Sequence, residues 1–162
     1  MNNENFMGNI DLIKVKEYAI SRFKLCSNFH GIEHWNRVYY FGMKLAEADS
    51  NVNKRVVALF AYLHDCERKD DFSDLQHGKR SAKKLYILSE SLLKDLSDDE
   101  FKLLYKAICH HNSGKITKNP TIGACFDADR LDLGRCGITL DPDLMSTQKG
   151  KEFALQEDLD DL

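Results

Sequence analysis

The chain has 162 residues, a usual length for one domain, and its formal net charge is −3. It therefore lacks the basic excess of proteins that bind nucleic-acid backbones. Apolar residues make up 43% of the sequence, enough for a core, and no run approaches the roughly 18 apolar residues that a membrane span needs. We expect neither a nucleic acid nor a membrane as a partner.

The five cysteines are an odd number, and the sequence contains no Cys-x-x-Cys pair. This pattern argues against a disulfide framework and favours a reducing compartment. The first residues lack the basic flank and apolar stretch of a secretory signal. We therefore predict a cytoplasmic protein.

The apolar residues follow helical spacing, and the sequence has no hairpin signal and no long alternating run. Residues 1–9 are expected to form a flexible N-terminus, followed by a single helical domain over residues 10–162. The first two predicted helices cover residues 10–26 and about 33–48. Between them lies a polar-aromatic connection in which His30 is expected to be a turn residue.

The third predicted helix, over residues 53–64, is almost wholly apolar and should be the most buried element. A polar loop over residues 65–76 leaves its end directly. A fourth helix, basic on one face, is predicted over residues 78–94.

Ser97 and Glu100 have the spacing of a capping box, which predicts the start of a fifth helix that ends near His111. A loop over residues 112–119 separates it from a sixth helix over residues 120–133, which glycines terminate. The C-terminal segment is expected to form a last short helix with an acidic end. The sequence thus predicts an all-α protein, a single compact bundle of about six to seven helices.

His64 and Asp65 are adjacent where the most apolar helix meets the polar loop. A buried imidazole and carboxylate need a partner, and a divalent cation satisfies both. These groups are good ligands for Mn, Fe, Co, Ni or Zn. The pair alone is a weak signal, because a histidine also suits the negative end of a helix dipole.

Other potential ligands also lie at helix ends or on inner faces. His34 opens the second predicted helix, and Asp129 lies on the half-apolar helix CFDADRLDL. His77 opens the fourth predicted helix, and His111 ends the fifth. In a helical bundle such positions can converge on one pocket.

The segments HGIEHW, LFAYLHD and DADRL resemble the HD-domain superfamily of metal-dependent phosphohydrolases. The family pattern is a histidine, then a His-Asp pair, then a distant aspartate. The segments at Asp74–Gly78, AICHHNSG and TIGACFDADRLDL extend the resemblance to a bacterial subgroup of small single-domain members. The resemblance covers residues from about 30 to 147 and does not specify a substrate.

The resemblance implies that His34, His64, Asp65 and Asp129 hold a divalent metal ion, with Asp65 central to catalysis and best placed to touch a second ion. The expected metal is Mn, Mg, Fe, Co, Ni or Zn, with one or two ions bound. Together these features imply an HD-domain-like helical domain.

Two further histidines stand where some family members add ligands. His77 and His111 are the candidates for a second metal or a phosphate contact. His111 is preferred over His110 because its spacing from Ala107 matches the family segment.

The expected function is hydrolysis of a phosphomonoester or phosphodiester, of a nucleotide or a related small molecule, by metal-activated water. Arg68 and Lys115 are candidates to contact the substrate phosphate. The expected partner is thus a small phosphorylated substrate, and the sequence is compatible with a homodimer. Asp132, one turn beyond Asp129, is a candidate to orient a ligand, whereas Asp127 is expected to face solvent.

Two alternatives stay open at this point. A related helical scaffold with a His/Asp site serves as a di-iron oxygenase in some relatives of the family. A non-catalytic, metal-stabilised binding module would show the same ligands without turnover. The sequence has no glycine-rich phosphate loop, so nothing supports an ATP-driven kinase.

Overall fold

The computed structural model describes residues 6–26 and 29–156, and these ranges contain helices and no strand. The helices are α1 (Leu12–Arg22), α2 (Ile32–Ala48), α3 (Lys54–Leu63), α4 (His77–Leu88), α5 (Asp98–His110), α6 (Pro120–Leu131) and α7 (Gln148–Ala154). Short 3₁₀ segments cover His111–Ser113, Asp132–Cys136 and Pro142–Leu144. The predicted all-α class is confirmed. None of the described helices is long and apolar enough to cross a membrane.

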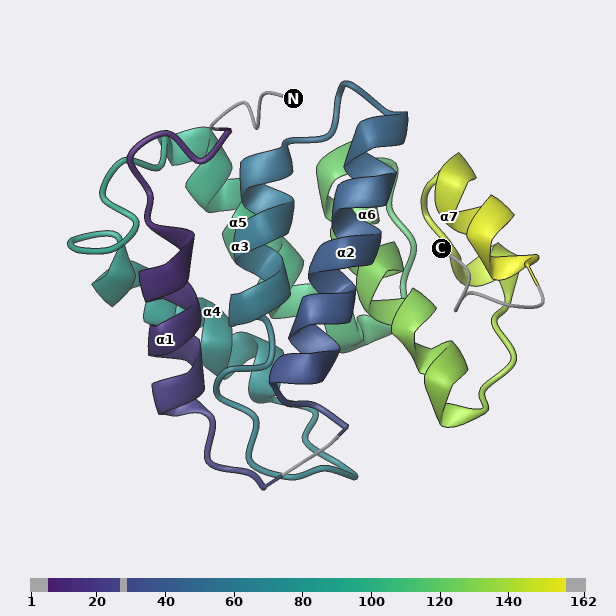
Figure 1. Cartoon of the computed structure of the whole chain (residues 1–162), viewed down its shortest axis with the longest axis horizontal. Coiled ribbons are helices and arrows are strands. Elements are labelled where there is room, and N and C mark those ends of the chain that lie inside the picture. The colour runs from purple at the N-terminus through teal and green to yellow at the C-terminus, as the bar shows by residue number, and fades with distance from the viewer. Residues whose placement is uncertain (1–5, 27–28, 157–162) are drawn as a thin grey trace.

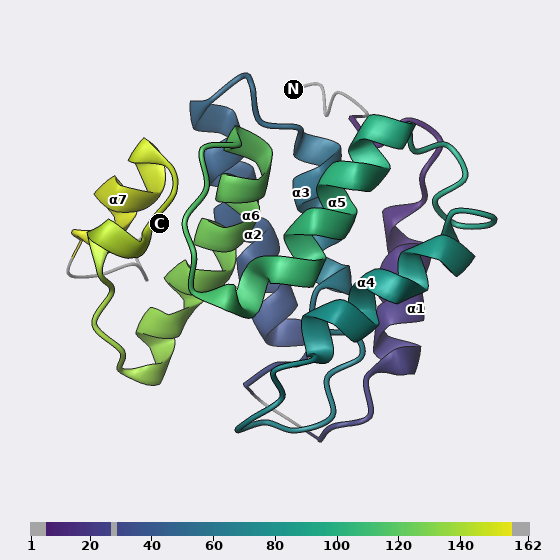
Figure 2. The ribbon, with the colours of Figure 1, turned by 180° about the vertical axis from the view of Figure 1, so that it is seen from behind.

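Helix α3 is the centre of the molecule. Every residue from Val56 to Leu63 is buried, so the helix needs neighbours on all sides. It packs on α1, α2, α5 and α6, with α5 behind it in Figure 1 and in front of it in Figure 2. The prediction that this helix is the most buried element agrees with this arrangement.

Side-chain caps define where several helices begin. The oxygen of Asn53 accepts a hydrogen bond from the Val56 amide at the start of α3, and the capping box of Ser97 and Glu100 is present at α5. Asp11 caps α1, which therefore begins at Leu12, later than predicted.

Helix α4 ends at Leu88, whereas the sequence predicted a helix as far as residue 94. The hydroxyls of Ser89 and Ser91 bond to backbone carbonyls of the preceding turn. Such local bonds compete with helix propagation, and residues 89–95 form turns.

The sequence predicted a flexible N-terminus over residues 1–9 and a last short helix, starting at about Thr147, with an acidic end. Residues 1–5 of the expected flexible N-terminus lie outside the described residues. Residues 6–9 form a turn in which Met7 is buried. Helix α7 follows Thr147, as predicted for the last helix, while residues 157–162 of the acidic end lie outside the described residues.

Several helix termini meet at one end of the molecule, which is the lower end in Figure 1. There α2 and α4 begin and α3 ends, beside the last turns of α5 and α6. Gly78 permits part of this convergence, because a Cβ at that position would lie 2.6 Å from the Ile108 carbonyl oxygen. A side chain at residue 78 would push α4 away from α5 and separate His77 from His111.

Candidate metal centre

Two adjoining groups of ligand atoms lie where the helix termini meet. In the first, His34 Nε2 lies 3.2 Å from His64 Nε2 and 3.3 Å from Asp129 Oδ1. His64 Nε2 lies 3.6 Å from both Asp129 Oδ1 and Asp65 Oδ2. Ligand atoms that surround one cation at about 2.1 Å are about 3.0–3.4 Å apart. The closest of these separations fall in that range, and His34 Nε2 and Asp65 Oδ2, at 3.9 Å, would draw slightly closer around a single ion.

The second group shares Asp65 with the first. Asp65 Oδ1 lies 3.0 Å from His77 Nε2 and 3.5 Å from His111 Nε2. The two imidazole nitrogens are 2.8 Å apart. The Asp65 carboxylate thus lies between the groups, with one oxygen directed to each.

In all four imidazoles, Nδ1 makes a hydrogen bond within the protein. Its partners are Asp132 Oδ2 at 2.6 Å for His34, the Phe60 and Ala61 carbonyls at 3.1 Å for His64, the Asp74 carbonyl for His77, and the Ile108 carbonyl at 2.8 Å for His111. These acceptors require the proton on Nδ1. In the neutral imidazoles, the lone pair on Nε2 therefore faces the cluster.

The cluster consequently consists almost entirely of acceptors. Lone pairs of His77 and His111 face each other, and Asp65 Oδ1 is buried with no hydrogen-bond partner among the described residues. Buried acceptors that lack donors are costly. A divalent cation satisfies all of them, so the donor set fits such an ion.

The pKa values of these groups reflect the same crowding. Burial lowers the pKa of His64 to about 4, which keeps this imidazole neutral. Burial alone would raise the pKa of Asp65, but the surrounding imidazoles, His64 and His111 first, favour its ionised form and hold the pKa well below its ordinary value. A neutral imidazole and an ionised carboxylate are the forms that bind metals.

Asp132 lies behind the first group, where the sequence suggested an orienting residue. Its Oδ2 accepts the His34 Nδ1–H bond at 2.6 Å. Arg37 Nε donates to Asp132 Oδ1 at 2.6 Å, and Arg135 Nε donates to Asp132 Oδ2 at 2.7 Å. The two guanidiniums hold the carboxylate in place, and the carboxylate fixes the tautomer and direction of His34.

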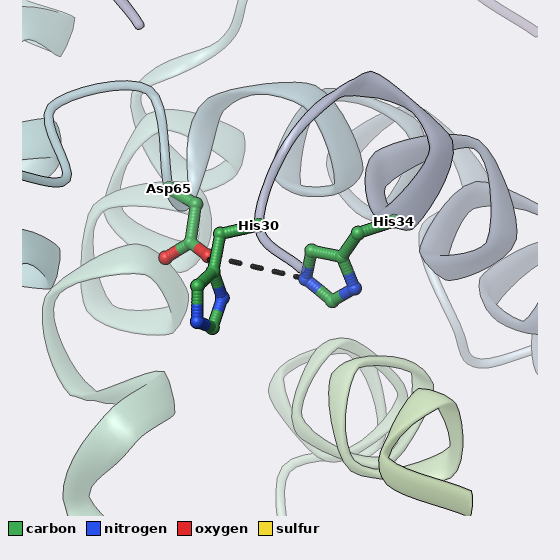
Figure 3. A group of neighbouring side chains, drawn as sticks. All are labelled: His30, His34 and Asp65. Atoms are coloured by element: carbon green, nitrogen blue, oxygen red, sulfur yellow. Dashed lines mark ion pairs between the residues drawn. The ribbon is translucent and has the colours of Figure 1, made fainter. Parts of the chain in front are cut away.

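His30 is a residue that sequence reasoning missed, since it was expected to be only a turn residue. Its Nδ1 lies 3.4 Å from Asp65 Oδ2, and its Nε2 lies 3.2 Å from the Asp71 carbonyl oxygen. Figure 3 shows His30, His34 and Asp65 side by side, and together they form a further group able to hold a metal. The available signal was the four-residue spacing between the two histidines of HGIEHW.

The predicted phosphate contacts differ in position. Arg68 Nη1 lies 3.7 Å from Asp65 Oδ1 and 3.3 Å from the His77 ring nitrogens. Arg68 also lines the cavity of about 500 Å³ that opens over the cluster. Lys115 is exposed and is not among the residues that line this cavity.

His110 is exposed and His111 is buried at the cluster, which agrees with the preference for His111.

The expectation for Asp127 was wrong, because this residue is fully buried instead of facing solvent. Its Oδ1 accepts from the Ser146 amide, and its Oδ2 accepts from the amide and hydroxyl of Thr147, each at 2.7 Å. The carboxylate thereby holds the start of α7 against α6. The sequence spacing alone gave no sign of these donors, because they lie about twenty residues further along the chain.

Among solved structures, the chain is similar to a crystal structure of a predicted HD superfamily hydrolase from an uncultured Thermotogales bacterium. The TM-score is 0.70 with 22% sequence identity, and the match covers 95% of this chain and 89% of the other. The HD-domain resemblance seen in the sequence is thus confirmed at the level of the fold. No family model matches the sequence, and no curated protein matches it.

Proposed function

We propose that this protein is a metal-dependent phosphohydrolase that cleaves a phosphomonoester or phosphodiester of a nucleotide or a related small molecule. The observation that carries the proposal is the buried cluster of imidazole Nε2 atoms and carboxylate oxygens, in which Asp65 Oδ1 has no hydrogen-bond donor among the described residues. The likeness in fold to a predicted HD superfamily hydrolase supports hydrolysis as the type of reaction. The fold alone does not specify the reaction, so the site carries the argument.

The first metal ion is held in this proposal by His34, His64, Asp65 and Asp129. Two carboxylates and two neutral imidazoles leave a divalent ion nearly neutral, with room for further ligands. His30 lies close enough to Asp65 to contribute to the same position. The imidazole content favours Mn, Fe, Co, Ni or Zn over Mg, which prefers oxygen ligands.

Asp65, His77 and His111 would hold a second ion. Asp65 would contribute to both positions, because its Oδ2 faces the first group and its Oδ1 faces the second. The close approach of the His77 and His111 nitrogens supports this assignment, since a neutral pair would otherwise place two lone pairs against each other.

A bound divalent ion supplies a strongly acidified water as nucleophile and offsets negative charge on the phosphoryl oxygens. Residues of the chain orient the ligands and bind the substrate phosphate. Asp132 holds His34 in its ligating tautomer, and Asp74 accepts the Nδ1–H bond of His77 through its backbone carbonyl. Arg68, which lines the cavity, is positioned to bind a phosphate oxygen.

The proposal is tested by a panel of phosphate monoesters and diesters, chiefly nucleotides, with the full chain loaded separately with Mn, Mg, Co and Ni. We expect metal-dependent phosphate release that a chelator abolishes. Metal binding without turnover on any ester would overturn the proposal and favour a binding module. Retained iron with oxygen consumption and no phosphate release would instead favour a di-iron oxygenase.

A further inference from the structure

The cavity over the cluster has an exposed apolar rim that the proposed hydrolysis leaves unexplained. Its floor consists of the buried histidines and carboxylates, and its rim includes Phe29, Phe72, Leu133 and Ile138. These four side chains come from three separate segments of the chain. Scattered exposed apolar residues are ordinary, but several that share the mouth of one cavity indicate a binding surface.

Phe72 is the most exposed residue of this rim, with 97% of its surface accessible. It lies on the loop that connects the ligands Asp65 and His77. An accessible phenyl ring next to a polar site has a free face on which a ligand can stack.

The loop presents this ring from an ordered backbone. Asp70 Oδ1 accepts hydrogen bonds from the amides of Phe72 at 2.7 Å and Ser73 at 3.0 Å. Asp74 Oδ2 accepts from the Lys69 amide at 2.9 Å and pairs with Arg80. Because bonds bracket Phe72 on both sides, the backbone that carries the ring has little conformational freedom to lose when a ligand binds.

Phe29 is tied to the metal centre by Arg135. The guanidinium lies over the Phe29 ring, 5.9 Å from its centroid, and donates to the Phe29 carbonyl. The same guanidinium bonds to Asp132, which holds His34. The ring and the cation thus form a fixed apolar and positive wall of the cavity.

We propose that the rim selects phosphate esters whose organic group carries a planar aromatic ring, which stacks on Phe72 and Phe29 while the phosphate reaches the cluster and Arg68. This inference rests on the proposed function and adds its substrate class. The cavity of about 500 Å³ exceeds the needs of a phosphate group alone. A planar ring gains from stacking on aromatic faces, whereas a short aliphatic group has only apolar contact to offer.

The test measures binding of phenylphosphonate and methylphosphonate to the Mn-loaded full chain by calorimetry. Their P–C bonds resist hydrolysis, so binding is measured apart from turnover. We expect phenylphosphonate to bind at least about tenfold more tightly, from the stacking of one ring. The variant Phe72→Ala should reduce this ratio about fivefold to tenfold, and Phe72→Trp should preserve it.

Leu75→Ala is the matched control, since Leu75 lies on the same loop, is 77% exposed and is not among the residues that line the cavity. It should leave both affinities unchanged. Equal affinity for the two phosphonates, or a ratio that Phe72→Ala does not alter, would overturn the inference.

Two further comparisons separate the possibilities. A phosphonate analogue of adenosine monophosphate shows whether a nucleobase or a ring attached directly to phosphorus binds more tightly. Whichever ligand binds more tightly, the inference requires that Phe72→Ala weakens its binding. Aromatic preference in binding without hydrolysis of any ester would refute the proposed function alone. Hydrolysis of esters with no aromatic preference would refute this inference alone.

Discussion

The junction of α6 with α7 and the histidine–aspartate cluster both bury carboxylates, but they satisfy them in opposite ways. Asp127 accepts three hydrogen bonds from backbone and side-chain donors of Ser146 and Thr147. Asp65 Oδ1 is equally buried and faces imidazole nitrogens that offer lone pairs. The first carboxylate has all its hydrogen-bond partners within the protein, whereas the second keeps an unsatisfied oxygen that a bound cation would satisfy.

Helix α6 contributes to both regions. Asp127 and Asp129 are two residues apart, which corresponds to about 200° around a helix, so they lie on nearly opposite sides. Asp127 fixes α7, and Asp129 joins the cluster with His34 and His64. Position on a helix, and not burial alone, therefore separates the structural acid from the candidate ligand.

The variant Asp65→Ala should have the largest effect, because it removes the carboxylate that distinguishes the cluster from the α6–α7 junction. Removal of the carboxylate that faces both ligand groups should reduce phosphate-ester hydrolysis at least about 1000-fold, because the metal supplies several kcal/mol of transition-state stabilisation. Bound metal, measured by elemental analysis, should fall with it. Far-ultraviolet circular dichroism should still report most of the helix content. Full activity in this variant would refute the assignment of the cluster.

A smaller effect is expected from Asp132→Asn. The variant keeps the shape of the side chain but weakens its hold on His34 Nδ1. Loss of such an orienting partner typically weakens metal affinity about 10–100-fold. Titration of the metal-free protein with Mn checks this, and an unchanged affinity would show that Asp132 does not position His34.

The pH dependence of metal binding should follow His34. Burial alone lowers the pKa of His34, but its hydrogen bonds to Asp129 and Asp132 outweigh burial and raise the pKa to about 9 in the metal-free protein. Metal must then displace a proton at neutral pH. Affinity should therefore rise about tenfold per unit between pH 6.5 and 8.5, and titrations at several pH values would reveal a flat profile if this is wrong.

The raised pKa of His34 has the opposite effect on the stability of the metal-free protein, which should fall as the pH rises. A raised pKa means that protonated His34 contributes stability below its ordinary pKa of 6.5, and that this contribution is lost as the pH rises through about 9. Urea unfolding of metal-free protein should thus show declining stability over this window. Metal-loaded protein, in which His34 is unprotonated, should not share the decline.

The smallest effect on metal binding is expected at the other region. Asp127→Ala should leave metal affinity within about threefold, because the residue contacts α7 and not the cluster. It should nevertheless lower the free energy of unfolding by about 3 kcal/mol, since three donors lose their acceptor. Urea denaturation measures the loss, and an unaltered midpoint would contradict a structural role.

The sequence predicted the helices well because their signals are local. The capping box at Ser97 and the apolar run that becomes α3 depend only on neighbours a few residues away. Apolar spacing alone predicted too long a helix α4, because the side chains of Ser89 and Ser91 bond to backbone carbonyls and end it at Leu88.

The candidate site was predicted in outline through the family pattern, which brings together His34, His64, Asp65 and Asp129. The misassigned Asp127 and the overlooked His30 have a common physical reason. Their environments are made by segments distant in sequence: Ser146 and Thr147 for the acid, and Asp65 for the histidine. No local periodicity encodes such partners.

The most direct test of the account is a crystal structure of the protein loaded with Mn, with the metal located by anomalous scattering. We predict one peak bound by His34, His64, Asp65 and Asp129. A second peak should be bound by Asp65, His77 and His111, with the Asp65 carboxylate bridging the two. Absence of metal from the cluster at saturating Mn, or metal bound only elsewhere, would contradict the account.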